Sequence, residues 1–140
     1  MRRILLLLVL VSLAFAPAPL PKPDLSKEDL KKMQGKWVLV SRLHEGRLTS
    51  HVVATVEIDG DRWTYVNARG DWRAPGKLTL DANKVPKRLD WGRRTHRGVY
   101  ELNGDTLIFV FTTSGDPDKI RDLDGNKPGR YREVLKRAKR

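Results

Sequence analysis

The sequence contains no cysteine among its 140 residues. Disulfide bridges, thiolate metal ligands, thiol nucleophiles and a lipidated N-terminal cysteine are therefore excluded. A chain without these devices must be stabilised by a hydrophobic core, and its length allows one such core but not two. We therefore expect a single domain.

Long apolar runs are also scarce, and the one present lies at residues 4–13. It follows Arg2 and Arg3 and precedes Ala14-Phe15-Ala16, which together give the basic start, apolar centre and small-residue cleavage site of a secretory signal. The run is shorter than the roughly 20 apolar residues that a permanent membrane helix needs. We therefore predict a signal peptide at residues 1–16, an exported protein in the periplasm, cell envelope or extracellular space, and no transmembrane segment after cleavage.

Motifs of catalysis and metal binding are missing as well. The sequence has no H-E-x-x-H, no G-x-S-x-G and no phosphate-binding glycine loop, and His44, His51 and His96 do not have metal-ligand spacing. The aspartates of residues 116–124 lack the closing glutamate of an EF-hand loop, so turn chemistry explains them better. We expect no catalytic residue, no metal, no cofactor and no enzymatic activity.

The segment after the signal peptide divides into a linker and a short helix. Prolines alternate through residues 17–25, which predicts an extended linker. Ser26 with Asp29 forms a capping-box pattern, and Gly35 supplies a stop signal, so we predict a helix over residues 26–34. The folded domain is expected to cover residues 26–140.

After the helix, apolar residues alternate with polar ones between closely spaced turn signals, which is the pattern of β-strands. Asp59-Gly60-Asp61 predicts one hairpin, and Asn103-Gly104 predicts a type I′ turn in another. About eight strands are expected, at 37–42, 52–58, from 63, 77–80, 87–91, 98–102, 105–111 and 130–136. Their regular spacing suggests a sandwich or an up-and-down antiparallel β-barrel.

The strand of residues 106–111 is apolar on both faces. Leu107, Phe109 and Phe111 share one face, while Ile108 and Val110 share the other. Because both faces need cover, the outer face requires the N-terminal helix or a partner protein. We expect the helix to cover it.

Three segments together resemble a known family. They are Met33 to Ser41, Gly76 to Asp81 running into Pro86-Lys87, and Gly98 to Leu107, and the closing Tyr131 to Arg137 is similar to the final strand of that family. In order and spacing they resemble a family of small, uncharacterised lipocalin-like domains of planctomycete bacteria. The resemblance covers nearly the whole mature chain and implies a lipocalin-like β-barrel in an exported setting. It carries no established activity.

Gly35-Lys36-Trp37 also resembles the Gly-x-Trp signature of true lipocalins. That resemblance implies a barrel-closing role for Gly35 and Trp37, with Arg132 or Arg137 packing across the indole by a cation–π contact.

The aromatic residues suggest what a barrel of this size would hold. In a barrel of about eight strands, rings can either line a ligand cavity or fill the interior, and the sequence leaves both alternatives open. The residues expected to line such a pocket are Trp63, Tyr65, Tyr100, Phe109 and Phe111. The leading hypothesis is a monomeric, exported binding protein for a small apolar ligand.

The strongly basic composition, with a formal net charge of +11, supports a second hypothesis. Arg88, Arg93, Arg94 and Arg97 lie close to Trp91, and such a cluster can bind phosphates or sulfates. The alternative function is a cell-envelope interaction protein whose basic surface binds anionic polymers, lipids or a protein partner. A solvated hairpin end is the structural explanation of the same cluster, and no nucleic-acid-binding signature accompanies it.

Overall fold

The computed structural model describes residues 22–49, 53–92 and 96–139. The predicted signal peptide and most of the predicted linker lie outside these ranges. Among the described residues, no helix has the length and apolar character needed to cross a membrane.

The α-helix of the described residues, α2, spans Leu25–Met33 and is capped differently from the prediction. Asp24 is the N-cap, and its carboxylate accepts hydrogen bonds from the backbone N–H groups of Ser26 and Lys27. The predicted capping box is wrong because both of its residues have tertiary partners. The hydroxyl of Ser26 accepts a bond from the backbone of Ala82, and Asp29 is buried under the helix.

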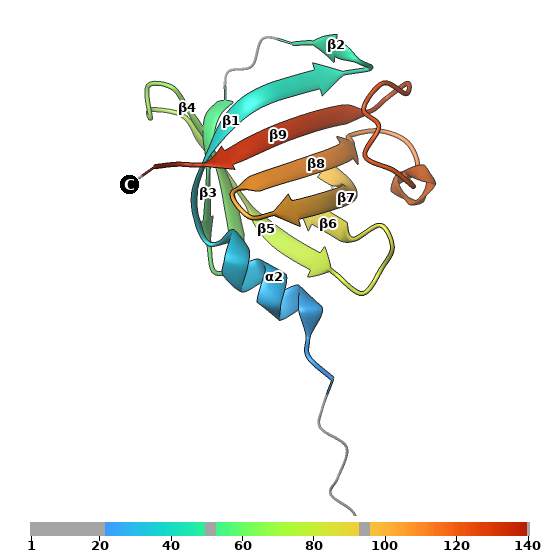
Figure 1. Ribbon diagram of the computed structural model, residues 1–140. Coiled ribbons are helices and arrows are strands. Elements are labelled where there is room, and N and C mark those ends of the chain that lie inside the picture. The colour runs from blue at the N-terminus through green and yellow to red at the C-terminus, as the bar shows by residue number, and fades with distance from the viewer. Residues whose placement is uncertain (1–21, 50–52, 93–95, 140) are drawn as a thin grey trace, which may run out of the picture.

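The strands form a closed antiparallel barrel, as predicted. Apart from the short β2, each strand pairs with the next along the chain, and the first long strand also pairs with the last, which closes the sheet (Figure 1). A two-residue strand, β2, extends the pairing of β1 beside the barrel wall. The strands are β1 (Gly35–His44), β2 (Arg47–Leu48), β3 (Val53–Asp59), β4 (Arg62–Asn67), β5 (Arg73–Asp81), β6 (Arg88–Trp91), β7 (His96–Asn103), β8 (Thr106–Thr112) and β9 (Tyr131–Arg137).

The β3–β4 and β7–β8 hairpins have glycine at the first central position of the turn, Gly60 and Gly104. In the β7–β8 hairpin, Asn103 pairs with Thr106, so the two turn residues are Gly104 and Asp105. Gly104 has φ +56°, and Asp105 is not among the residues with positive φ. This is the arrangement of a type II′ turn, so the predicted type I′ turn at Asn103-Gly104 is wrong by one residue.

The barrel interior contains the main hydrophobic core. Inward side chains from all eight barrel strands, together with Met33 of α2, belong to this core. The largest side chains that are wholly buried there are aromatic: Trp37, Trp63, Phe109 and Phe111. Burial of rings of this size dominates the hydrophobic stabilisation of a small domain.

A second, smaller cluster covers part of the outer face of the barrel. Val99 of β7 and Val110 of β8 pack against Ile120, with Leu123 beside them. Ile120 and Leu123 belong to the long connection between β8 and β9, which also contains the 3-10 helix η1 (Pro117–Lys119). The prediction that α2 covers this face is therefore wrong, because the connection itself folds back over it.

The two ends of the barrel differ. At the end that we call closed, α2 packs Leu30 and Met33 against the core, and the indole N–H of Trp37 donates to the carbonyl of Met33 at 2.8 Å. The opposite end, which we call open, is where β1 ends at His44 and β9 begins at Tyr131. In Figure 1 the helix lies below the barrel and the β8–β9 connection lies to its right.

Candidate functional site

A β-bulge in β1 decides which side chains face the interior at the open end. Leu39 pairs with Leu135 of β9, but the next pair is Ser41 with Val134, so β1 contains one extra residue at Val40. Beyond such a bulge the inward and outward positions exchange. Arg42 and His44 therefore face the barrel interior, although regular alternation from Leu39 would turn them outward.

Arg42 enters a buried polar network. Its Nη2 lies 2.8 Å from Oε1 of Glu133, and the hydroxyl of Tyr65 donates to Oε2 of the same carboxylate at 2.7 Å. Glu133 is fully buried, and the Nε of Arg42 is buried without a hydrogen-bond partner. Burial raises the pKa of Tyr65 well above its usual value, and the neighbouring charge of Glu133 adds to this effect.

A buried ion pair of this kind lowers the stability of a barrel core compared with well-packed apolar side chains. Removing two ions from water often costs more than their mutual attraction returns, and apolar residues of the same size would stabilise the fold as well or better. Departures of this kind concentrate at functional sites. The open end is therefore the candidate site.

Stacked rings adjoin the network. His44 stacks on Tyr131 with ring centroids 4.1 Å apart, Tyr131 stacks on Phe111 at 5.2 Å, and Phe111 stacks on Phe109 at 4.7 Å. The guanidinium of Arg42 lies 5.7 Å from the Tyr131 ring centre. We call His44, Tyr131, Phe111 and Phe109 the ring column. Because His44 and Tyr131 are only partly buried, the column ends at a partly exposed aromatic surface.

His96 joins the ring column from β7. Its ring lies between Trp91, at 4.5 Å, and Phe111, at 4.9 Å. Partial burial lowers the pKa of His96 to about 4, and the positive charge of Arg42 acts in the same direction. The imidazole is therefore neutral at physiological pH and adds an uncharged ring to the open end.

The five rings predicted to line a pocket lie along the whole interior. Trp63, Phe109 and Phe111 are wholly buried and pack in the core, whereas Tyr65 belongs to the polar network. Tyr100 points to the closed end and donates to Asp29 at 2.7 Å. Their role in holding a ligand stays a prediction.

The residues predicted to close the barrel meet at the end covered by α2. The guanidinium of Arg137 lies 4.3 Å from the Trp37 ring centre, and it donates to the backbone carbonyls of Gln34 and Lys32. Gly35, with φ +109°, makes the turn from α2 into β1. Arg132 lies elsewhere, opposite Leu43 on the outer face of β9.

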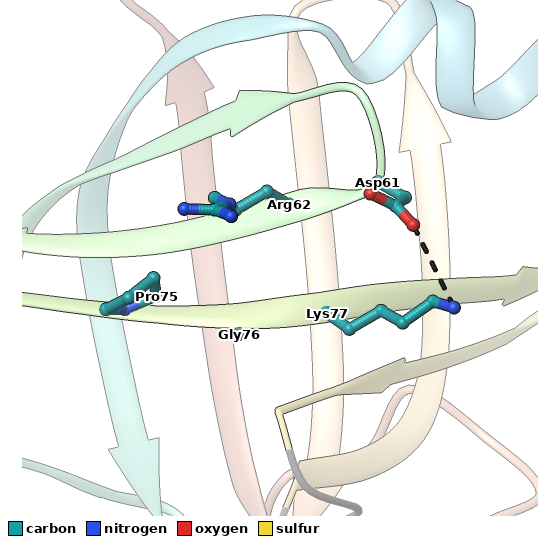
Figure 2. A pocket seen from close by; sticks show the side chains of 5 residues that line it. All are labelled: Asp61, Arg62, Pro75, Gly76 and Lys77. Carbon is teal, nitrogen blue, oxygen red and sulfur yellow. Dashed lines mark ion pairs between the residues drawn. The ribbon is translucent and has the colours of Figure 1, made fainter.

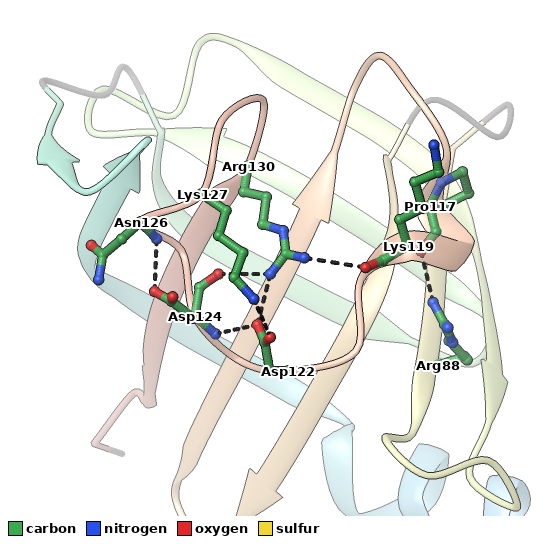
Figure 3. Close-up of polar contacts among 8 residues, drawn as sticks. All are labelled: Arg88, Pro117, Lys119, Asp122, Asp124, Asn126, Lys127 and Arg130. Atoms are coloured by element: carbon green, nitrogen blue, oxygen red, sulfur yellow. Dashed lines mark hydrogen bonds and ion pairs between the residues drawn. The ribbon is translucent and has the colours of Figure 1, made fainter.

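The structure describes two of the four predicted anion-binding arginines, Arg88 and Arg97, and each has a partner within the protein. Arg88 donates to the backbone carbonyl of Pro117 and so fastens the β8–β9 connection, as Figure 3 shows. Arg97 pairs with Asp90 at 3.3 Å on the neighbouring strand. Arg93 and Arg94 lie outside the described residues. Binding of a polyanion by these four arginines stays a prediction.

The aspartate-rich connection is held by ion pairs. Asp122 accepts from Lys127 and Arg130, each at 2.6 Å, and Arg130 also donates to the carbonyl oxygens of Asp124 and Lys119 (Figure 3). The hydrogen bond from Lys127 is the largest of the effects that lower the pKa of Asp122 to about 2. Among the described residues, no group of three or more acidic or histidine side chains is placed to hold a metal ion.

A surface hollow on the outer side of β4 and β5 is bordered by Arg62 and Lys77, which pair across the two strands (Figure 2). The ammonium of Lys77 is 3.9 Å from the carboxylate of Asp61, and both side chains are mostly exposed. At the bottom lies Gly76, where a Cβ atom would collide with the indole of Trp91. Tight packing of Trp91 explains this hollow without a ligand.

Sequence analysis missed Arg42, Glu133 and Asp29. Glu133 alone carried a signal, because it has the same parity as Tyr131 and Leu135 in the last strand and therefore had to face the core. Regular alternation in the sequence places Arg42 on the outer side of β1, but the bulge at Val40 turns it inward. Asp29 was assigned to a cap, whereas it accepts from both Lys87, at 2.6 Å, and Tyr100.

The fold defines the class of protein: over the described ranges, a closed, up-and-down antiparallel β-barrel of eight strands with one short α-helix, of the lipocalin-like kind. Comparisons with protein-family models, with curated proteins and with solved structures found no match to the chain.

Proposed function

We propose that this chain is an exported, non-enzymatic binding protein that holds a small, largely apolar ligand at the open end of its barrel. The observation that carries the proposal is the bulge at Val40, which turns Arg42 and His44 toward Glu133 and the ring column. A planar apolar ligand would cover the exposed surface of His44 and Tyr131, and a polar group on it would lie near Arg42. Apolar walls with a few converging polar groups are typical of small-molecule sites.

The electrostatics favour a ligand without a strong charge. Glu133 already balances the guanidinium of Arg42, and His96 is neutral at physiological pH. An anionic ligand would meet the buried carboxylate, and a cationic ligand would meet Arg42. Aromatic stacking with hydrogen bonding is therefore the expected mode of binding.

The test uses a fluorescent aromatic probe, 1-anilinonaphthalene, with the full chain and two variants. His44→Ala removes the partly exposed end of the ring column, whereas Trp72→Ala removes an exposed ring from the β4–β5 loop and is the matched control. We expect the wild type and Trp72→Ala to bind the probe and His44→Ala to bind it about fivefold more weakly, since one aromatic contact contributes about 1 kcal/mol. Equal binding by all three proteins would refute the proposed site.

Native mass spectrometry of the protein purified from its source tests independently whether a small molecule is bound. A small molecule that co-purifies with the wild type and is lost in His44→Ala would identify the ligand class. Fractionation of the source cells tests export, because retention of the protein with an intact Met1 in the cytoplasm would contradict it.

A further inference from the structure

The outer wall of the barrel carries an aliphatic surface over β2, β1 and β9. Val38 and Val40 of β1 are 40% and 50% exposed, and Leu48 of β2 is 77% exposed. Leu43 of β1 is paired with Leu48, and Val134 of β9 is paired with Ser41, so both lie on the same outer side. We call Val38, Val40, Leu43, Leu48 and Val134 the aliphatic face.

The charges that β1, β2 and β9 contribute to the outer wall have one sign. Lys36, Arg132 and Lys136 project from the same outer side of β1 and β9. The only acidic residue of β1, β2 and β9 is Glu133, which is buried inside the barrel. Lys36 has a partner outside these strands, Glu57, but at 3.8 Å and largely exposed, which gives a weak ion pair.

Among the described residues, Val38, Val40 and Leu48 of this wall stay open to solvent. The β8–β9 connection places Ile120 over Val99 and Val110. It also reaches the wall at the open end, where Gly125 lies against the side chain of Arg132 and accepts a hydrogen bond from the backbone of Gly46. α2 covers the closed end, and Figure 1 shows β1 and β9 side by side above it. Exposed aliphatic residues grouped in this way mark interaction sites more often than isolated ones do.

We infer that the aliphatic face binds an anionic lipid surface. Valine and leucine side chains would enter the headgroup region, while the three cations would contact lipid phosphates. A second copy of the chain fits less well, because a symmetric contact would bring Lys36, Arg132 and Lys136 together with their own copies. A soluble polyanion would use the cations but gain nothing from the aliphatic side chains. The inference is independent of the proposed ligand site, because the face lies on the outer wall rather than at the open end.

Vesicle co-sedimentation with the full chain tests the inference. The probes are vesicles of phosphatidylcholine alone and vesicles of phosphatidylcholine with an equal amount of phosphatidylglycerol. Val40→Asp/Leu48→Asp places two carboxylates among the aliphatic side chains, and Lys36→Gln/Lys136→Gln removes two of the charges of the face. Val85→Asp is the matched control, because Val85 is 98% exposed in the β5–β6 loop and lies outside the face.

We expect binding of the wild type to the anionic vesicles only, with a steep loss as salt is added. Each lysine near an anionic surface should contribute about fivefold, so the double lysine variant should bind about thirtyfold more weakly. Val40→Asp/Leu48→Asp should abolish binding. Val85→Asp and His44→Ala should bind like the wild type, which separates this face from the ligand site. Matching circular dichroism and melting temperatures confirm that each variant folds.

Three results would overturn the inference. The first is absence of wild-type binding to the anionic vesicles. The second is full retention of binding in Val40→Asp/Leu48→Asp together with its loss in the lysine variant, which would show a polyanion contact. The third is a concentration-dependent dimer in sedimentation velocity that Val40→Asp/Leu48→Asp dissociates, which would assign the face to a second copy.

Discussion

Arg42 on β1 and Glu133 on β9 are direct partners across the strand pair that closes the barrel, and their side chains meet inside it with Nη2 and Oε1 2.8 Å apart. The pair therefore joins barrel closure to the chemistry of the open end. Tyr65 reaches the same carboxylate from β4, on another part of the barrel wall. Three strands are thus linked by one buried polar network.

Loss of Arg42 alone should be costly. Arg42→Met leaves the carboxylate of Glu133 buried without the guanidinium that pairs with it, and breaking a buried pair in this way destabilises by about 3–5 kcal/mol. The double variant Arg42→Met/Glu133→Leu should recover most of this loss because no charge remains. Urea unfolding of both proteins measures the difference. A loss below about 1 kcal/mol in the single variant would show that the two side chains are not energetically coupled.

The sequence predicted the strands well because each barrel strand alternates between a packed core and a less buried outer side. Residues 87–91 show this clearly, and the structure has β6 there as Arg88–Trp91, with Leu89 and Trp91 buried in the core. Local periodicity and turn residues are sufficient for such elements. The two-residue strand β2 has no periodicity and was not predicted.

The remaining features depend on contacts that are distant in sequence. The bulge at Val40 exists because of the pairing with β9, about a hundred residues away, and β1 gives no local sign of it. Asp29 is a capping residue by pattern but accepts from Lys87 and Tyr100. Cover of the outer face by Ile120 likewise required the path of a long connection. These are the places where the predicted helix cap, site and packing departed from the structure.

Stability should fall as the pH is lowered through the range from about 6.5 to 4 because of His96. Its folded-state pKa of about 4 lies below the ordinary value of 6.5, so the unfolded chain binds the proton more readily in that range. Above pH 6.5 His96 causes no loss of stability, and below pH 4 the loss has reached its full size. For a wholly buried ring, a pKa difference of this size would lower the free energy of unfolding by about 3 kcal/mol. Because the ring is partly exposed, solvent screening reduces this loss to about 1–2 kcal/mol.

His96→Gln should remove that part of the pH dependence. Urea unfolding at several pH values compares the variant with the wild type. The lowered pKa values of Asp29 and Asp122 act at lower pH, where carboxylates begin to protonate, so they do not obscure the upper part of the range. Parallel stability curves for the two proteins between pH 6.5 and 4.5 would contradict the assignment to His96.

Trp37→Ala should destabilise the domain by about 3–5 kcal/mol, the usual cost of removing a wholly buried large ring. Arg137→Ala should cost less, about 1–3 kcal/mol, because it removes hydrogen bonds to Gln34 and Lys32 and a cation–π contact from a partly exposed side chain. Thermal and urea unfolding measure both. If the two changes contribute additively in the double variant, the arginine does not act through the indole.

The bulge itself can be tested by two deletions in β1. Deleting Val40 removes the extra residue and leaves Arg42 and His44 facing the interior, so the pairing with Glu133 should persist at a cost of about 1 kcal/mol. Deleting both Val40 and Ser41 shifts the alternation by one position. Arg42 and His44 then turn outward, and Leu43 lies opposite Glu133.

The double deletion should therefore cost at least about 3 kcal/mol, because a buried carboxylate loses its cation. It should also abolish binding of 1-anilinonaphthalene, whereas the single deletion should retain it. Urea unfolding and probe titration measure these two effects, and the ring-current shifts of Tyr131 in NMR spectra report whether His44 still stacks on it. Equal stability and equal probe binding in the two deletions would mean that the alternation along β1 does not set the orientation of Arg42 and His44.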